Sequence, residues 1–137
     1  LTLSVSLHAP DDETRSQIMP ANRGRGVEQL MDACERYYAA TGRRISFEYA
    51  MIDGVNDSDG QARLQAAHAK RVAAHVNLIP LNHVEESRFE PTPPERLQRF
   101  KGLLERAGVN VTVRRSLGGD IDASCGQLRK KAAAGRA

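Results

Sequence analysis

Cys125 and its neighbours form the part of the sequence best suited to chemistry. Residues 113–128 read Val-Arg-Arg-Ser-Leu-Gly-Gly-Asp-Ile-Asp-Ala-Ser-Cys-Gly-Gln-Leu, so the thiol follows a Gly-Gly pair and lies near two arginines. Nearby cations stabilise the thiolate, which is the nucleophilic form of cysteine. The same pattern permits a structural role, because Ile121, Cys125 and Leu128 have the spacing of one helix face. By this spacing alone, Cys125 is more often a small buried core residue than a reactive thiol.

Four segments with strand-like alternation are separated by segments with helical periodicity. We expect strands at about 1–7, 44–52, 74–81 and 109–114 and helices at about 27–40, 60–72 and 93–107, with a short last helix near 121–131. Asp57 or Ser58 caps the second helix. Thr92 and Glu95 have the spacing of a capping box for the third, which ends at Gly108. The long connections favour parallel strands and therefore an α/β fold.

The expected strands have one apolar and one polar face, whereas parallel strands covered on both faces are continuously apolar. In the second strand, Phe47 and Tyr49 alternate with Ser46 and Glu48. In the third, Asn77 lies on the polar face as a structural hydrogen-bonding partner, and Glu48 is a candidate supporting residue. A polar inner face favours a partial TIM-like (βα) barrel around a polar ligand. A two-layer domain with a solvated sheet face is the alternative, but it is usually antiparallel.

The charge of the chain is unevenly distributed. The formal net charge of +3 combines −4 in residues 1–95 with +7 in residues 96–137. Clustered Lys and Arg are typical of surfaces that bind nucleic-acid phosphates. We therefore expect RNA contacts from this part of the chain. The residues concerned are Arg114, Arg115, Arg129, Lys130 and Lys131.

The cysteines and the hydropathy of the sequence indicate the environment in which the protein works. Cys34 and Cys125 give no disulfide framework, and Cys34 lies in the apolar stripe of helix 27–40, where we expect a buried core residue. No apolar segment has the length of a membrane span, and no signal-peptide pattern is present. We expect a cytoplasmic protein without membrane association.

Several segments resemble one enzyme family. Residues 114–128 read Arg-Arg-x-x-Gly-x-Asp-Ile-Asp-Ala-x-Cys-Gly-Gln-Leu. This is similar to the C-terminal signature of the radical S-adenosylmethionine (SAM) enzymes that methylate C2 of an adenine in large-subunit ribosomal RNA and in tRNA. Further matches, in the family's order, are Ser-Leu-His-Ala-Pro at 6–10, Met-Pro at 19–20, Asn22, Thr-Gly-Arg-Arg at 41–44, Phe-Glu-Tyr at 47–49, Gly-Val-Asn-Asp-Ser at 54–58 and His-Val-Asn-Leu-Ile-Pro-Leu-Asn at 75–82. Their number and order make the resemblance specific.

The resemblance implies a set of site residues. Ser6, Leu7 and His8 match a segment that contacts SAM, and Asn82 matches a further SAM contact. Cys125 matches the catalytic cysteine, whose sulfur takes a methyl group from one SAM. A radical from a second SAM then removes hydrogen from this group, and the carbon adds to adenine. From the residues alone, His8 is equally explained as a strand-end histidine bonded to a loop, and Asn82 as a turn residue.

The sequence departs from the family in its cysteines. Radical SAM enzymes hold a [4Fe–4S] cluster with three closely spaced cysteines, whereas this chain has only Cys34 and Cys125. The chain also opens on Leu1, within a strand-like run. We therefore expect residues 1–137 to be the C-terminal part of a radical SAM barrel, without metal ligands and inactive alone. Residues 115–137 are expected to be a basic tail that carries the catalytic cysteine loop.

The expected function is methylation of adenine C2 in ribosomal RNA and tRNA through S-methylated Cys125, with SAM and a [4Fe–4S] cluster as cofactors and a flavodoxin-type reductant. The related enzymes that methylate C8 of the same adenine and confer antibiotic resistance are an alternative, because they share the cysteine chemistry. A non-catalytic RNA-binding module is another. An unrelated barrel hydrolase is disfavoured, because the sequence has no carboxylate pair, Ser–His arrangement or metal-ligand spacing.

Overall fold

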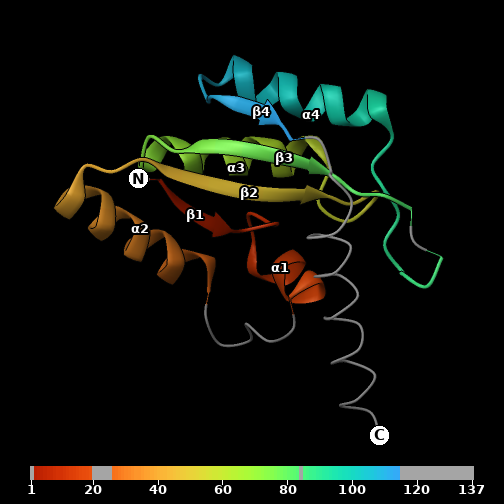
Figure 1. Cartoon of the computed structure of the whole chain (residues 1–137), viewed down its shortest axis with the longest axis horizontal. Coiled ribbons are helices and arrows are strands. Elements are labelled where there is room, and N and C mark those ends of the chain that lie inside the picture. The colour runs from red at the N-terminus through yellow and green to blue at the C-terminus, as the bar shows by residue number, and fades with distance from the viewer. Residues whose placement is uncertain (1, 20–25, 84, 115–137) are drawn as a thin grey trace, which may run out of the picture.

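The computed structural model describes residues 2–19, 26–83 and 85–114. In this part of the chain, four parallel strands lie in the order β1-β2-β3-β4. The strands are β1 (Leu3–Ser6), β2 (Ile45–Met51), β3 (His75–Pro80) and β4 (Val111–Val113), and the helices are α1 (Asp12–Ile18), α2 (Val27–Thr41), α3 (Asp59–Arg71) and α4 (Pro94–Arg106). The expected parallel α/β fold is confirmed (Figure 1).

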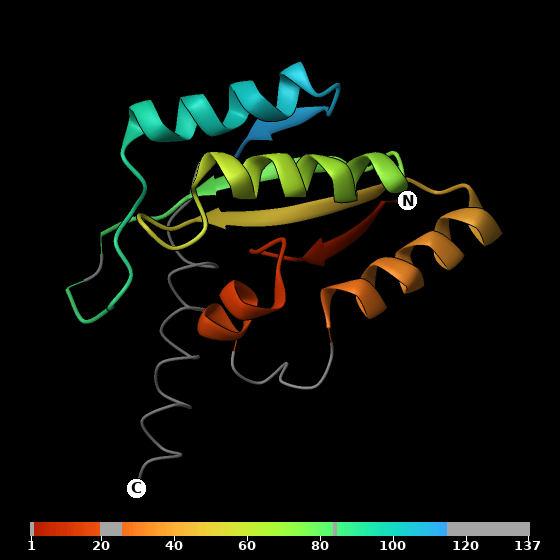
Figure 2. The ribbon, with the colours of Figure 1, turned by 180° about the vertical axis from the view of Figure 1, so that it is seen from behind.

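The long helices lie on one side of the sheet. Helices α3 and α4 lie behind the strands in Figure 1 and in front of them in Figure 2. Helix α2 packs against the same apolar layer through Val27, Met31 and Cys34, all of which are buried. The described strands therefore have one face covered by helices, as their alternation predicts.

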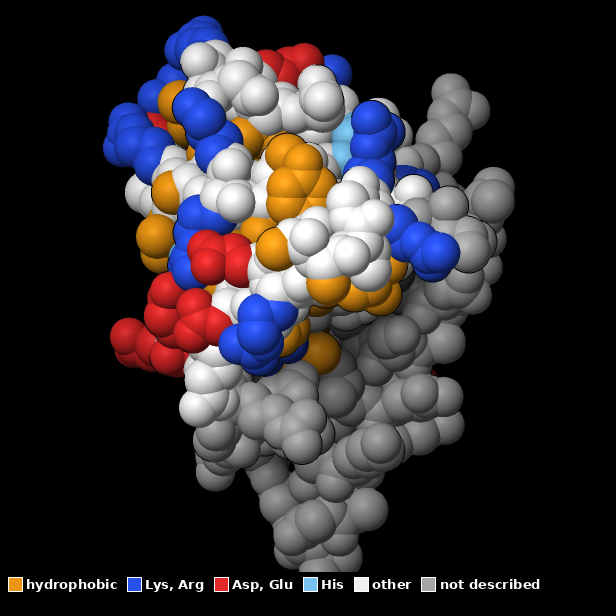
Figure 3. Space-filling view, turned by 90° about the vertical axis from the view of Figure 1, so that its left-hand side faces the viewer, with side chains coloured by type: hydrophobic (Ala, Val, Ile, Leu, Met, Phe, Trp, Pro, Cys, Tyr) orange, Lys and Arg blue, Asp and Glu red, His pale blue; other side chains and the backbone are white. Residues whose placement is uncertain are grey.

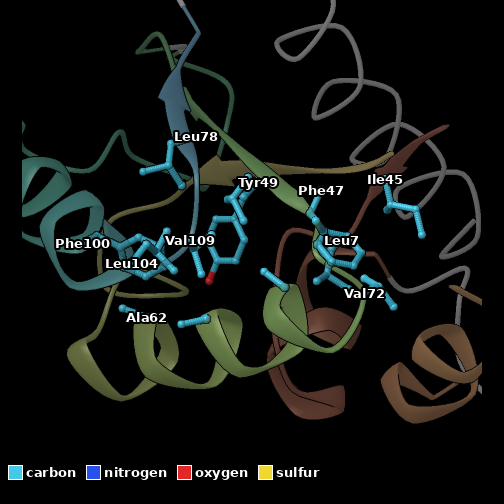
Figure 4. Packing of buried hydrophobic residues seen from close by; sticks show 14 of the residues in the cluster. Leu7, Ile45, Phe47, Tyr49, Ala62, Val72, Leu78, Phe100, Leu104 and Val109 are labelled. Atoms are coloured by element: carbon cyan, nitrogen blue, oxygen red, sulfur yellow. The ribbon is translucent and has the colours of Figure 1, made fainter. Parts of the chain in front are cut away.

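The apolar layer between sheet and helices is the main core (Figure 4). Phe47, Tyr49 and Phe100 are fully buried in it, and the rings of Tyr49 and Phe100 lie 5.2 Å apart between centroids. Burial of one such side chain stabilises the fold by about 1.5–3 kcal/mol. Cys34 lies in the same layer, and burial raises the pKa of its thiol. The prediction of a buried, structural Cys34 is confirmed.

The ends of the helices follow the sequence signals in part. Ser58 caps α3, and its reciprocal hydrogen bonds with Gln61 form a capping box. The capping box expected from Thr92 and Glu95 is wrong, because α4 begins after Pro93 without a side-chain cap. The Thr92 hydroxyl instead donates to Asp57 Oδ2 at 3.0 Å.

The polar face of the sheet is organised by side-chain hydrogen bonds. Strand register places Ser6, Glu48, Asn77 and Thr112 in one row across the four strands. The Asn77 amide donates to Ser46 Oγ at 3.0 Å and to Glu48 Oε1 at 3.3 Å, and its oxygen accepts from the Thr112 hydroxyl. The expected role of Asn77 as a structural partner and the expected polar face are therefore confirmed.

Two strand residues show that burial does not follow from the face alone. Ala50 alternates with Tyr49 and Met51 and is buried in a second apolar cluster near the ends of the strands, together with Ile18 of α1. Leu3, which alternates with Val5 on the apolar face of β1, is 37% exposed, because β1 is an edge strand of the described sheet.

Candidate cofactor-binding site

The predicted cofactor-binding residues lie at the edge of the sheet where the parallel strands end. Ser6 is the last residue of β1, with Leu7 and His8 directly after it, and Asn82 lies two residues beyond β3. Ser6 and Asn82 are exposed. Since functional groups of βα barrels gather at this edge, the positions agree with the predicted use of these residues.

Leu7 anchors this segment through its side chain. Leu7 is fully buried in the main core, main-chain atoms included. Its N–H donates to the Glu48 carbonyl at 3.1 Å, and its carbonyl accepts from Arg15 Nε at 3.2 Å. These bonds fix Ser6 and His8 against β2 and α1.

His8 is held in an unusual backbone conformation. Its φ of 59° lies in the left-handed region, which is uncommon for residues other than glycine. The Ala50 N–H donates to His8 Nδ1 at 2.9 Å, and the side-chain amide of Asn56 donates to the His8 carbonyl at 2.8 Å. Burial, and secondarily the charge of Arg15, lower the pKa of His8 from 6.5 to about 4. The imidazole is therefore neutral near pH 7, with one nitrogen bonded to β2.

Asn56 is a residue of this edge that the sequence indicated only as part of the Gly-Val-Asn-Asp-Ser motif. It is fully buried between the ends of β1 and β2. Gly54, at a φ of 69°, provides the turn that carries the loop, and its N–H donates to Asp57 Oδ1 at 3.1 Å. The motif therefore closes the edge at which His8 lies.

The polar face offers groups that fit a polar ligand such as SAM. Within the described residues, Glu48 Oε2 is shielded from solvent and has no hydrogen-bond partner, although Oε1 is bonded to Asn77. A buried acceptor of this kind matches a ligand rich in N–H and O–H donors. In the same part of the chain, no group of His, Cys, Asp or Glu could hold a metal ion. Residues for an iron–sulfur cluster are therefore not found among those described.

Cys125 lies outside the described residues, as do Arg115, Arg129 and the lysines of the basic tail. The preceding residue, Arg114, is exposed at the end of β4, and its N–H donates to the Leu78 carbonyl at 2.8 Å. The chain thus enters the segment of Cys125 from the same edge of the sheet that carries Ser6 and His8.

The opposite end of the molecule carries mixed charges. Figure 3 shows Lys and Arg side chains over this end and a group of Asp and Glu side chains at one border. Arg71, at the end of α3, forms ion pairs with three acidic residues of α2: Glu28, Asp32 and Glu35. An open hollow lined by Arg44, His75 and Glu105 also lies at this end. Because the predicted site residues lie at the other edge, we assign the hollow no part in the chemistry.

Within the described residues, no helix is long and apolar enough to cross a membrane.

Solved structures define the class of the fold. A radical SAM methyltransferase from Sphaerobacter thermophilus matches with a TM-score of 0.82 at 48% identity, over 93% of this chain and 37% of that one. A domain of a pyruvate-formate lyase-activating enzyme from Bacteroides vulgatus matches with a TM-score of 0.65 at 18% identity, over 82% of this chain and 66% of that one, and shows the shared fold alone. The parallel sheet with its helices is the partial (βα) barrel of radical SAM enzymes.

Sequence comparison identifies longer relatives of the chain. The probable dual-specificity RNA methyltransferase RlmN of Desulforamulus reducens is 56% identical over 131 residues, which are 96% of this chain and 37% of that protein. Its counterpart in Caldanaerobacter subterraneus is 50% identical over 131 residues, which are 38% of that protein. No protein-family model matches the chain. The chain thus corresponds to one part of these relatives: it matches them over 96% of its own length and spans less than half of theirs.

Proposed function

We propose that the chain is part of an enzyme that methylates C2 of an adenine in ribosomal RNA and tRNA. The observation that carries this proposal is the 56% identity, over 96% of the chain, with a probable dual-specificity RNA methyltransferase. The C8-methylating relatives remain the alternative, because the chemistry of Cys125 is common to both. Nucleoside mass spectrometry of RNA treated with the full-length enzyme distinguishes 2-methyladenosine from 8-methyladenosine, and the C8 product would refute this assignment.

The cofactor proposal follows from the strand-end residues. The Ser6 hydroxyl, the His8 imidazole and the Asn82 carboxamide would bind SAM, while Leu7 holds this segment through its buried side chain. Hydroxyl, imidazole and amide groups suit the amino acid, ribose and adenine parts of this molecule. Together with a [4Fe–4S] cluster held outside this chain, SAM supplies a methyl group and an adenosyl radical. The full-length enzyme would also need a one-electron reductant of the flavodoxin type and would act in the cytoplasm.

Cys125 is the proposed methyl carrier between SAM and the adenine. The test uses the full-length enzyme under anaerobic, reducing conditions, with Cys125→Ala compared with Cys34→Ala as the other cysteine of the chain. We expect Cys125→Ala to abolish methyl transfer to RNA, and the methylated cysteine peptide should be absent from its mass spectra. The free energy of unfolding should change by less than about 1 kcal/mol. Cys34→Ala should instead lose stability and keep the modification. Methyl transfer by Cys125→Ala would overturn the proposal.

The basic tail is the proposed RNA contact. Neutralising Arg115, Arg129 or Lys130 should lower the slope of log affinity against log salt by about one per lost phosphate contact. Arg71→Gln is the matched control, because the guanidinium of Arg71 is held in ion pairs with α2. RNA affinity of the full-length enzyme that does not depend on salt would refute this role.

A further inference from the structure

We propose that Asn56 is a positioning residue, which holds His8 as a neutral imidazole with its proton on Nε2, so that His8 donates a hydrogen bond to an acceptor atom of the bound cofactor. The identity of the cofactor as SAM rests on the proposed function. The tautomer of His8 and the part of Asn56 in fixing it rest on the structure alone.

The tautomer follows from the contact with β2. A backbone N–H is only a donor, so His8 Nδ1 must accept from Ala50 at 2.9 Å and carries no proton. In a neutral imidazole the proton then lies on Nε2. A second proton on Nδ1 would direct two N–H groups at each other. Burial and the nearby Arg15 of α1 oppose that proton as well, since they lower the pKa of His8 to about 4.

Asn56 fixes the backbone that presents the imidazole. Its amide nitrogen donates to the carbonyls of His8 at 2.8 Å and Ala50 at 2.6 Å, and its amide oxygen accepts from the Ile52 N–H at 2.8 Å. The Asn56 carbonyl in turn accepts from the Tyr49 hydroxyl at 2.6 Å. Every polar group of this side chain is thus used to join the end of β1 to the end of β2.

Only a carboxamide satisfies this arrangement. The site needs two donors and one acceptor from a fully buried side chain, and aspartate has no donor when ionised. The left-handed backbone of His8 is also intrinsically unfavourable, and the bond from Asn56 to its carbonyl helps to hold it. Asn56 therefore determines where the imidazole lies.

The second nitrogen of His8, Nε2, takes no part in this network. Among the described residues, none forms a hydrogen bond with Nε2, and the side chain is only partly buried. A donor at this position fits the carboxylate, the ribose oxygens or the ring nitrogens of SAM. It does not fit the ammonium group or the sulfonium centre, which bring no acceptor.

Two substitutions at position 8 test the hydrogen bond donated by Nε2 separately from the contact of Nδ1 that supports the fold. Asparagine places an acceptor near the position of Nδ1 and tolerates the left-handed backbone, but it has no group at the position of Nε2. Glutamine is longer and brings an N–H donor toward that position. We expect His8→Asn of the full-length enzyme to bind S-adenosylhomocysteine about tenfold more weakly by calorimetry, and His8→Gln to recover part of this loss.

The tautomer is tested by nitrogen NMR of the full-length enzyme labelled at histidine, with the His8 signals assigned from His8→Asn. We expect Nδ1 to have the chemical shift of an unprotonated nitrogen and Nε2 that of a protonated one, both unchanged between pH 6 and 8. Asn56→Asp should move both signals toward averaged values and weaken cofactor binding. Asn110→Asp is the matched control at an exposed asparagine before β4 and should change neither.

The results distinguish this inference from the proposed function. A proton on Nδ1, or titration of His8 between pH 6 and 8, overturns the inference even if the enzyme binds SAM and methylates RNA. Equal affinity of wild type and His8→Asn overturns the donor role. If Asn56→Asp fails to fold, the wild-type spectrum and the two position-8 variants decide. Absence of any SAM binding would refute the proposed cofactor, while the expected tautomer in wild type and its loss in Asn56→Asp would still support the role of Asn56.

Discussion

Because His8 is neutral in the folded protein, we expect this residue to lower the stability of the fold as the pH falls. The unfolded chain binds a proton at its histidines with a pKa near 6.5, whereas the pKa of His8 in the folded protein is lowered to about 4. Between these values the unfolded state holds more protons at this position than the folded state. The contribution of His8 to stability therefore decreases as the pH falls from 6.5 to 4 and is constant below that.

The magnitude follows from the difference between the pKa of His8 in the two states. A tenfold difference in proton affinity corresponds to about 1.4 kcal/mol, so a decrease in pKa from 6.5 to about 4 gives an upper limit of about 3 kcal/mol. His8 is partly accessible, and solvent screening reduces this figure. A loss of about 2 kcal/mol between pH 6.5 and pH 4 is therefore expected from this one residue, which is a large part of the stability of a small domain.

The assay is urea unfolding of the 137-residue chain, followed by far-UV circular dichroism because the sequence has no tryptophan. His8→Asn is the comparison, because asparagine keeps an acceptor for the Ala50 N–H and does not titrate. The stability difference between wild type and this variant should change by about 2 kcal/mol from pH 6.5 to pH 4. Parallel pH profiles of the two proteins would refute the lowered pKa of His8.

Three further substitutions test the packing and the helix ends. Phe100→Ala should destabilise the chain by about 3–5 kcal/mol in urea unfolding, because it leaves a cavity beside Tyr49 in the main core. Ser58→Ala removes one half of the capping box of α3 and should cost about 0.5–2 kcal/mol by the same measurement, whereas an unchanged midpoint would contradict the cap. Hydrogen bonds from Arg99 and Arg96 hold the pKa of Asp59 below its usual range, so the stability that these bonds provide is present above pH 4 and is lost as the pH falls further; Asp59→Asn should remove this dependence from acid titrations followed by circular dichroism.

The sequence predicts the part of the fold that depends on local pattern. Alternation in β2 correctly separates Phe47 and Tyr49, which are buried under the helices, from Glu48, which lies on the polar face. Such a pattern is readable because neighbouring side chains of a strand point to opposite faces. The same rule places Leu7 among the core residues, where it is fully buried.

Helix α1 is not predicted from the sequence because its stability is not local. It has seven residues and no long apolar stripe, and isolated helices of this length are marginal in water. Its N-terminus is capped by Asp11, which accepts from the Thr14 N–H at 2.7 Å. Its place in the fold is set by Ile18 in the second apolar cluster and by the bond from Arg15 to Leu7. These partners are brought together only by the folded sheet.

The contacts at the edge of the sheet were likewise not predictable from local sequence, because they join residues that are far apart in the chain. The spacing of Thr92 to Glu95 predicts a helix cap, but the Thr92 hydroxyl bonds to Asp57, 35 residues away in sequence. Asn56 reaches back 48 residues to the carbonyl of His8, and Ala50 reaches back 42 residues to its ring. Side-chain spacing within a segment carries no information on such pairs. A motif match could mark these positions, but only the folded structure assigns atoms to them.

The helix-covered face of the sheet and the edge at which its strands end therefore depend on different kinds of interaction. The helix-covered face depends on apolar area, and a hydrophobic side chain of similar volume can replace another there at a cost of about 1.5 kcal/mol or less. The edge with His8 and Asn56 depends on directed hydrogen bonds, in which a change of one donor leaves buried carbonyl groups unsatisfied. A substitution at this edge should thus affect the position of the imidazole before it affects the core.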